Sequence, residues 1–462
     1  MTAKYSKSLF ILLPAIAMML GWGLRGHIGG GPFGAMIPGA MVALSISLLL
    51  KLPPAFASIL VVFGVFGIGL GGEMTYGQTL GFLRNPDTVW WGTAGTTLKG
   101  SAWGFLGGAV FSMGFLFHRI PKKIILKGLL LMMAGYFLGF KLINEPMLLY
   151  FSDPANPRAE SWAALLFGAV SLLVYLRFRI STSDFRLVRR FALYGLAGGG
   201  LGFGLGGFWM VLGSNLPDVL FKNWWKAMEF TFGFLLGGAM GLAAWKSRNV
   251  IIPDETAENE IKKFTLPALT ELGILLAVAL FIHWLFPNLI DSVKNAIGSG
   301  DGFWLSMIRG VVRVLSTYAF AGFILVLLII RFPRVSWQLG ITLTFCHAAI
   351  DLVRDFYPDR QPWDPFTMHF FWVFTMTAIV ALLTVYFSRG KNSVIHLFQL
   401  LIWSGIIISL LRLGLLSGSL SVEGMSICQI VCNRFFVDIF FILSALAVTW
   451  ILWRMKSMQS PV

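Results

Sequence analysis

The sequence predicts an all-α polytopic membrane protein, and three observations lead to this prediction. Of the 462 residues, 57% are hydrophobic and only 12% are charged. The mean hydropathy is +0.78, and apolar runs long enough to cross the roughly 30 Å hydrocarbon core of a bilayer recur along the chain. The longest polar insert, near residues 246–264, is much shorter than the roughly 50 residues of a small domain. Soluble enzymes, disulfide scaffolds and disordered proteins are therefore excluded.

The apolar runs predict about fourteen transmembrane helices. In order along the chain, they cover residues 9–24, 33–50, 54–72, 93–117, 125–144, 160–177, 191–212, 226–245, 266–287, 305–330, 335–353, 367–387, 394–416 and 433–453. Because fourteen is an even number, both termini are expected on the same side of the membrane.

The basic residues predict which side that is. If the N-terminus is cytoplasmic, the segments on that side hold 22 of the 36 Lys and Arg residues but only six of the 21 Asp and Glu residues. Such an excess of Lys and Arg is typical of cytoplasmic loops. We therefore expect a multi-pass protein of the plasma (inner) membrane with both termini in the cytoplasm.

The formal net charge of +15 would by itself suggest a nucleic-acid partner. Here the excess lies in short loops between apolar spans, where it directs topology and attracts anionic lipid. We expect the lipid bilayer as a partner, no nucleic acid and no cofactor. The oligomeric state is not predicted.

Motifs of the first four spans recur in the next four, which predicts tandem four-helix repeats in parallel orientation. Three pairs of segments match in order: Met18–Leu24 with Met132–Leu138, Gly69–Gly72 with Gly204–Gly207, and Phe105–Gly108 with Leu235–Gly238. The predicted units are repeat A at 1–123, repeat B at 124–248, a four-helix unit at 265–391 that resembles a third copy, and a two-helix appendix at 392–462.

The glycine motifs also match the letters of a dinucleotide fingerprint, Gly-x-Gly-x-x-Gly, at Gly67–Gly72 and Gly202–Gly207. Neither copy follows a strand in a βαβ unit, so the phosphate-binding mechanism has no scaffold. Small residues at this spacing let transmembrane helices approach closely. We interpret both motifs as helix-packing motifs.

Ionisable residues in apolar segments are costly and therefore indicate function. Repeat A carries Arg25, His27 and Glu73 where repeat B carries Gly139, Lys141 and Phe208. We interpret repeat A as functional and repeat B as mainly scaffold. The segment from residue 73 to 91 adds Tyr76, Gln78, Arg84 and Asp87 and is predicted to be either re-entrant or an outer loop, in which Glu73 pairs with Arg25.

A second polar cluster lies in the last third of the chain. Arg309 and Arg313 are one helical turn apart, and so are His347 and Asp351, so each pair shares a helix face. The cluster is completed by Arg354, Asp355, Asp359 and Trp363. Arginine pairs suit carboxylate, sulfate or phosphate groups. Internal salt bridges, such as Asp351 to Arg313, are the alternative.

Two functions remain open. The first is a secondary transporter of an anionic or sugar-like solute, coupled to H⁺ or Na⁺. In it, the substrate-binding residues are Arg25, His27, Arg84, Arg309, Arg313, Arg354 and Trp363. Glu73, His347, Asp351 and Asp355 carry protons, and Tyr76, Gln78, Asp87 and Asp359 are secondary candidates. The second is a membrane-embedded enzyme acting on a glycan or lipid-linked sugar through outward-facing carboxylates. No local spacing of a metal site is present, and none is predicted.

Overall fold

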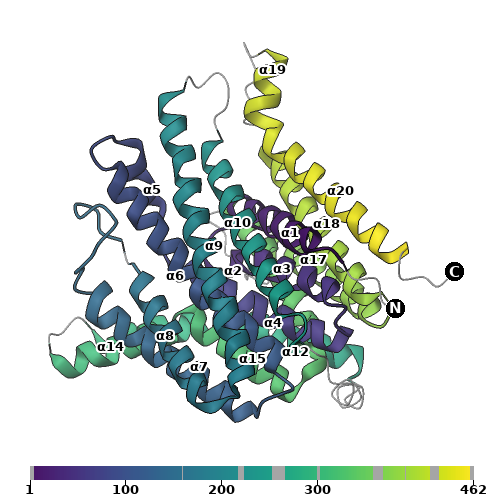
Figure 1. Cartoon of the computed structure of the whole chain (residues 1–462), viewed down its shortest axis with the longest axis horizontal. Coiled ribbons are helices and arrows are strands. Elements are labelled where there is room, and N and C mark those ends of the chain that lie inside the picture. Colours follow the sequence, from purple (N-terminus) through teal and green to yellow (C-terminus); the bar gives the residue numbers. More distant parts are fainter. Residues whose placement is uncertain are drawn as a thin grey trace.

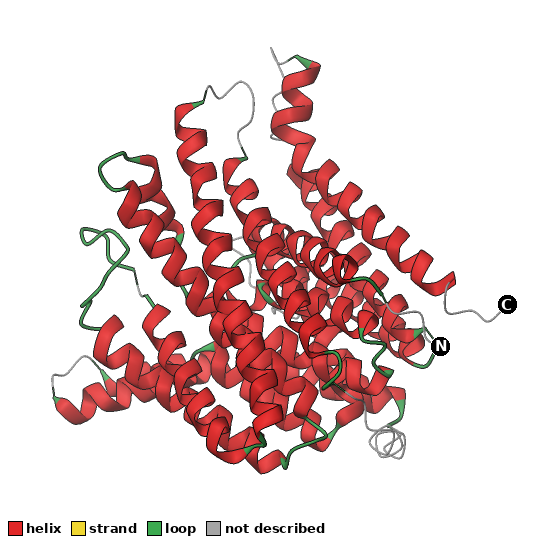
Figure 2. Ribbon diagram, in the orientation of Figure 1, coloured by secondary structure: helices red, strands yellow, loops and turns green. Residues whose placement is uncertain are grey.

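We analysed a computed structural model of the chain. It describes residues 5–158, 160–216, 223–251, 266–298, 302–356, 368–390, 392–416 and 426–457. Within these ranges the chain is helical with connecting loops and contains no strand, as Figure 2 shows. The prediction of an all-α protein is confirmed for this part of the chain.

Six helices of the N-terminal half form a closed ring (Figure 1). Each packs against the next, and the last packs against the first. In ring order they are α1 (Lys7–Ile28), α3 (Met36–Leu49), α4 (Pro54–Leu70), α6 (Val89–Leu116), α9 (Thr182–Asn215) and α10 (Trp224–Ser247). The ring joins four helices of repeat A to two of repeat B, so the two predicted repeats do not form separate bundles.

Aromatic side chains fill the centre of the ring. Trp22 of α1 lies with its ring centroid 4.8 Å from that of Trp103 on α6 and 4.4 Å from that of Phe232 on α10. Phe203 of α9 stacks on Phe232 at 3.8 Å. All four side chains are almost fully buried. The ring therefore encloses a packed core in this region.

The tightest helix contact, between α6 and α9, depends on glycine. A Cβ atom at Gly104 would lie 1.9 Å from the carbonyl oxygen of Gly195, and one at Gly100 would lie 2.2 Å from that of Gly199. Gly67 of the first fingerprint-like motif similarly faces the backbone of Gly107. The helix-packing interpretation of these glycines is confirmed, because only residues without a side chain allow this approach.

The remaining helices pack around the ring. α7 (Lys122–Gly139) and α8 (Trp162–Arg179) form a pair, and α8 contacts α6. In the C-terminal half, α15 packs on α4 and α7, α18 on α1 and α3, and α20 on α1. The helices of this half are α12 (Ala268–Leu280), α13 (Phe286–Ile297), α14 (Phe303–Leu315), α15 (Tyr318–Arg331), α16 (Leu343–Phe356), α17 (Met368–Ser388), α18 (Ser393–Leu416), α19 (Ile427–Ile430) and α20 (Phe436–Ser457).

Every predicted span overlaps a helix of the structure. Among the described residues, eleven helices are long and apolar enough to cross a membrane, or twelve if α14 and α15 count as one span, with a bend of 54° at residues 316–317. The other two predicted spans, 93–117 and 335–353, are helical in α6 and α16 but are not among these candidates. The structure thus supports a polytopic membrane protein, whereas the count of fourteen stays a prediction.

Several helices are interrupted. Between α4 and α6 the chain forms only short pieces, η1 (Gly71–Glu73), α5 (Gly77–Gly81) and η2 (Phe82–Arg84). Wide π-helical turns occur at η3 (Phe140–Asn144), η4 (Phe281–Leu285), η6 (Gln338–Thr342) and η8 (Val431–Phe435). The short connecting helices are α2 (Gly31–Gly34) and η5 (Pro333–Val335). Such interruptions are frequent at functional sites. η3 borders the cavity described next through Phe140, and η4 borders a second cavity beside it.

Candidate ligand-binding site

A cavity of about 450 Å³ lies between α7, α13 and α14. It brings together three residues that the sequence analysis singled out, Glu73, Arg309 and Arg313. Tyr136 and Glu145, from α7 and the turn after η3, also line it, as does Lys294 of α13. Its volume lies in the range of small-molecule sites.

The amphipathic helix α14 positions the two arginines. Arg309 and Arg313 are one turn apart and face the cavity, whereas Phe303, Trp304 and Ile308 are exposed on the outside of the helix. The Arg313 guanidinium lies 4.1 Å from the ring centroid of Phe140, so the aromatic face holds its plane in place. Among the described residues, Arg313 makes no ion pair, and the alternative of a bridge to Asp351 is not formed.

Glu73 reaches the same cavity from η1. Its Oε1 accepts a hydrogen bond from the backbone N–H of Tyr318, with the two atoms 2.5 Å apart. That N–H belongs to the first residue of α15 and has no partner within the helix, because the break at residues 316–317 starts a new helix there. The carboxylate thus caps a helix N-terminus, where negative charge is favoured, and the alternative pair of Glu73 with Arg25 is not formed.

Arg25 is instead enclosed at the end of the six-helix ring. It is 3% exposed, and its Nη1 donates to the Tyr76 hydroxyl at 2.8 Å while two other nitrogens reach the Gly31 carbonyl. Its guanidinium lies within 6 Å of the ring centroids of Trp22, Tyr76 and Trp103. Within the described part of the chain, Arg25 has no carboxylate partner, and aromatic faces stabilise its charge.

A third group surrounds His347 on α16. Its Nε2 lies 2.8 Å from Asp351 Oδ2, and Arg354 Nη1 lies 3.5 Å from Asp351 Oδ1. The ring of His347 stacks on that of His283 with 5.2 Å between centroids. Phe33 contacts both imidazoles as well as Tyr318, so one aromatic ring links the histidine pair to the helix that Glu73 caps.

The other predicted residues lie elsewhere. His27 Nε2 is 3.7 Å from Asp438 Oδ1 on α20. Gln78 binds the backbone of Asp153 and Asn156. Arg84 and Asp87 are exposed and do not line the cavity beside α14. Asp359, Trp363 and the side chain of Asp355 lie outside the described residues.

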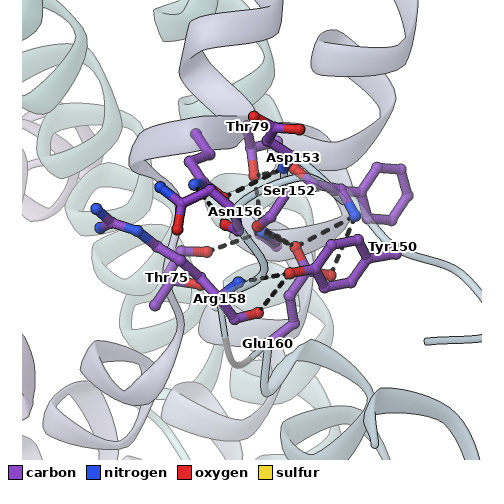
Figure 3. Close-up of polar contacts among 11 residues, drawn as sticks. Thr75, Thr79, Tyr150, Ser152, Asp153, Asn156, Arg158 and Glu160 are labelled. Carbon is purple, nitrogen blue, oxygen red and sulfur yellow. Dashed lines mark hydrogen bonds and ion pairs between the residues drawn. The ribbon is translucent and has the colours of Figure 1, made fainter. Parts of the chain in front are cut away.

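The sequence analysis missed a buried ion pair between Lys99 and Glu160. Lys99 Nζ lies 2.6 Å from Glu160 Oε1, and both side chains are 0% exposed. Lys99 also donates to the Thr79 hydroxyl and the Thr75 carbonyl. Glu160 accepts from Ser152 and from the Phe151 N–H. Figure 3 shows this network, which connects the interrupted segment after α4 to the loop before α8 through hydrogen bonds.

A second missed pair lies in α10, beside Arg25. Glu229 is buried, and its two oxygens accept from Trp225 Nε1 at 2.9 Å and Lys226 Nζ at 2.7 Å. Lys99, Lys226 and Glu229 all lie inside predicted spans, so the cost of charge in lipid would have identified them. Repeat B therefore also contributes buried charge.

No group of three or more His, Cys, Asp or Glu side chains in the part of the chain that the structure describes could hold a metal ion. Asp351 is the carboxylate that lies beside His347 of the histidine pair. The arrangement offers basic groups around a cavity that two carboxylates also line: Glu73, which accepts from the N-terminus of α15, and Glu145, which pairs with Lys141.

Comparisons with known proteins add no identity. No family model matches the chain, and no curated protein or solved structure matches it either.

Proposed function

We propose that the protein is a secondary transporter of a small anionic solute, and that the cavity beside α14 is its binding site. The observation that carries the proposal is that Glu73 meets Arg309 and Arg313 at one cavity. Glu73 lies more than 200 residues before the two arginines in the sequence. Interrupted helices and internal repeats are typical of secondary transporters. Paired arginines suit carboxylate and phosphate groups.

The charges at the cavity favour an anion over a neutral sugar. Glu145 is paired with Lys141, at 2.7 Å between Nζ and Oε2, and Glu73 faces a helix N-terminus. The Arg313 guanidinium packs on an aromatic ring and forms no ion pair in the described structure, with Glu73 as an electrostatic neighbour across the cavity. A bound anion would supply a countercharge for a guanidinium that faces this cavity, through charge-assisted hydrogen bonds.

Coupling to H⁺ follows from the groups beside the cavity. Glu73, His347 and Asp351 can each take up a proton, and Phe33 and Tyr318 join them in one contact chain. Protonation of a carboxylate or imidazole at membrane depth is a usual part of proton-driven transport. We propose that these three groups sense or carry the coupling proton.

The membrane-embedded hydrolase remains the second candidate, because Glu73 and Glu145 line the same cavity. Two carboxylates flanking a cavity are the minimum for glycosidic-bond hydrolysis. The pairing of Glu145 with Lys141 holds that carboxylate in an ion pair, which is unfavourable for a general acid. Transport therefore accounts for the arrangement better.

Uptake into proteoliposomes tests the proposal. Labelled phosphate, sulfate, acetate, glucuronate and glucose are offered to the wild type and to Arg313→Gln, with Arg179→Gln as control because Arg179 is exposed on α8. We expect counterflow of one or more of the anions but not of glucose, lost in Arg313→Gln and kept in the control. Equal counterflow in both variants, or hydrolysis of a glycan without any uptake, would refute the proposal.

The membrane and the orientation belong to the same proposal, namely the plasma membrane with both termini in the cytoplasm. Single cysteines introduced at the ends of α6 and α8 and labelled in intact cells test the orientation. Labelling from outside at the basic end of α8, near Arg177 and Arg179, would contradict it.

A further inference from the structure

A second cavity of about 270 Å³ adjoins the first. The two share Glu73, Lys294, Ser316 and Thr317 among their lining residues, so they meet at the break between α14 and α15. Their linings differ sharply. The first cavity has the arginines, and the second is mostly apolar beyond the shared residues.

The apolar cavity is formed by α13 and α15. Phe286 of α13 and Phe320 of α15 stack with 4.9 Å between ring centroids, and Ile290 and Ala321 line the cavity from the same two helices. Phe33, the ring that contacts the histidine pair, also lines it. A hydrophilic anion would leave this space unfilled, whereas an apolar group there would be removed from water.

We propose that the ligand is an amphipathic anion, with its charged group at Arg309 and Arg313 and an apolar chain or ring in the adjoining cavity. The inference rests on the proposed function and narrows its substrate class. Because the shared residues form the junction, the charged group and the apolar group belong to one molecule rather than to two separate ligands. Glu73, at the junction, lies beside the point where head and tail join.

The outer face of α14 indicates how such a molecule enters. Phe303, Trp304, Ile308 and Val311 are exposed on that face, and α14 projects from the edge of the bundle, as Figure 1 shows. An amphipathic helix of this kind lies in the membrane interface. The arginines then lie at the level where the charged groups of amphipathic molecules collect, and the apolar cavity lies beside α15.

Affinity for alkyl phosphates of increasing chain length tests the inference. The protein in phosphatidylcholine nanodiscs is titrated calorimetrically with ethyl, butyl and hexyl phosphate, with the corresponding alcohols and alkylammonium ions as controls and empty nanodiscs to correct for partitioning. Each buried CH₂ group should tighten binding about threefold to fourfold. The alcohols and ammonium ions should not bind.

Two variants of the apolar cavity separate ligand packing from misfolding. Ala321→Phe fills the cavity, and Leu327→Phe, on the lipid-facing side of the same helix, is its control. Ile290→Thr makes the cavity more polar, and the neighbouring exposed Leu289→Thr is its control. We expect both cavity variants to lose most of the gain in affinity from ethyl to hexyl phosphate, while both controls keep it. An equal gain in affinity per CH₂ group in all four variants, or no gain with chain length in the wild type, would overturn the inference.

A lipid and a water-soluble molecule could both supply this chemistry, and phosphatidic acid in the nanodisc distinguishes them. If phosphatidic acid competes with hexyl phosphate for binding, the ligand is a lipid. If phosphatidic acid does not compete, the ligand is a water-soluble anion. Both outcomes require the amphipathic site. Chain-length-dependent binding without uptake would refute transport alone. Arg313-dependent uptake of acetate or phosphate without a chain-length effect would refute this inference alone.

Discussion

The Lys99–Glu160 pair and the α14 cavity are two charged regions of one protein, and they differ in how their charges are compensated. At Lys99 the ammonium has a carboxylate, a hydroxyl and a carbonyl as partners, and neither side chain of the pair is exposed. At Arg313 the guanidinium has an aromatic ring and an open cavity of about 450 Å³. Complete compensation indicates a structural role, because nothing is left for a ligand to satisfy.

The comparison therefore separates charges that stabilise the fold from charges that are available to a ligand. A buried ion pair with good geometry roughly offsets its own desolvation, but removing one member leaves an uncompensated charge. A basic group at a cavity can lose its charge with little damage to the fold, because it contributes few internal bonds. Each prediction below tests one of these two kinds of charge.

The largest effect is expected at Lys99. Replacing it by Met leaves Glu160 charged and buried, which should cost about 3–5 kcal/mol of stability. Restoring neutrality with Glu160→Gln in the same chain should recover part of this loss. Thermal or chemical unfolding of the single and double variants in detergent measures the coupling. Additive losses in the double variant would show that the pair is not the structural unit we describe.

Arg313 should show the opposite behaviour. Arg313→Gln is expected to lower anion uptake at least about tenfold, since a charge-assisted hydrogen bond contributes about 1.5–3 kcal/mol, while the unfolding midpoint stays close to that of the wild type. Arg179→Gln should change neither quantity. A large loss of stability in Arg313→Gln, comparable with that in Lys99→Met, would place Arg313 on the structural side of the comparison.

Glu73 should affect coupling more than binding. In Glu73→Gln the amide oxygen can still accept the Tyr318 N–H, so the start of α15 is kept. We expect the variant to exchange anion across the membrane within about threefold of the wild-type rate. It should lose accumulation driven by an imposed pH gradient. Unchanged accumulation would exclude Glu73 as the group that carries the coupling proton.

A change in salt concentration should produce the smallest of these effects on anion binding and stability. Raising ionic strength from roughly 0.05 to 0.5 M shortens the Debye length several-fold, so anion binding at the open cavity should weaken by a few-fold. Stability that depends on Lys99 and Glu160 should not respond, because that pair has no contact with solvent. Calorimetry and unfolding at both salt concentrations provide the comparison within one sample.

Much of the fold was predictable from the sequence, because hydropathy identifies helices directly. Each predicted segment overlaps a helix, and this includes α6, whose glycines and Lys99 make it less apolar than a usual span. The breaks in the helices were harder to predict from the sequence. The start of a new helix at Tyr318 depends on Glu73 from another part of the chain, and no local pattern encodes that contact.

The site was predicted in part. Arg309 and Arg313 could be paired by their spacing, and Glu73 could be singled out because it follows an apolar span. Their meeting at one cavity depends on the packing of α14 against α7, which periodicity does not contain. His283 was missed although it lies in a predicted span, since a lone histidine among apolar residues carries no signal until its ring is seen stacked on His347.

Accessibility of the cavity from the two sides of the membrane tests the central claim most directly. Ser316, at the junction of the two cavities, is replaced by Cys in a chain whose native cysteines are changed to Ser. A membrane-impermeant thiol reagent is then applied from inside or outside with and without butyl phosphate. A transporter should be labelled from both sides, with the anion changing the balance. Labelling from one side only, unchanged by the anion, would contradict our account.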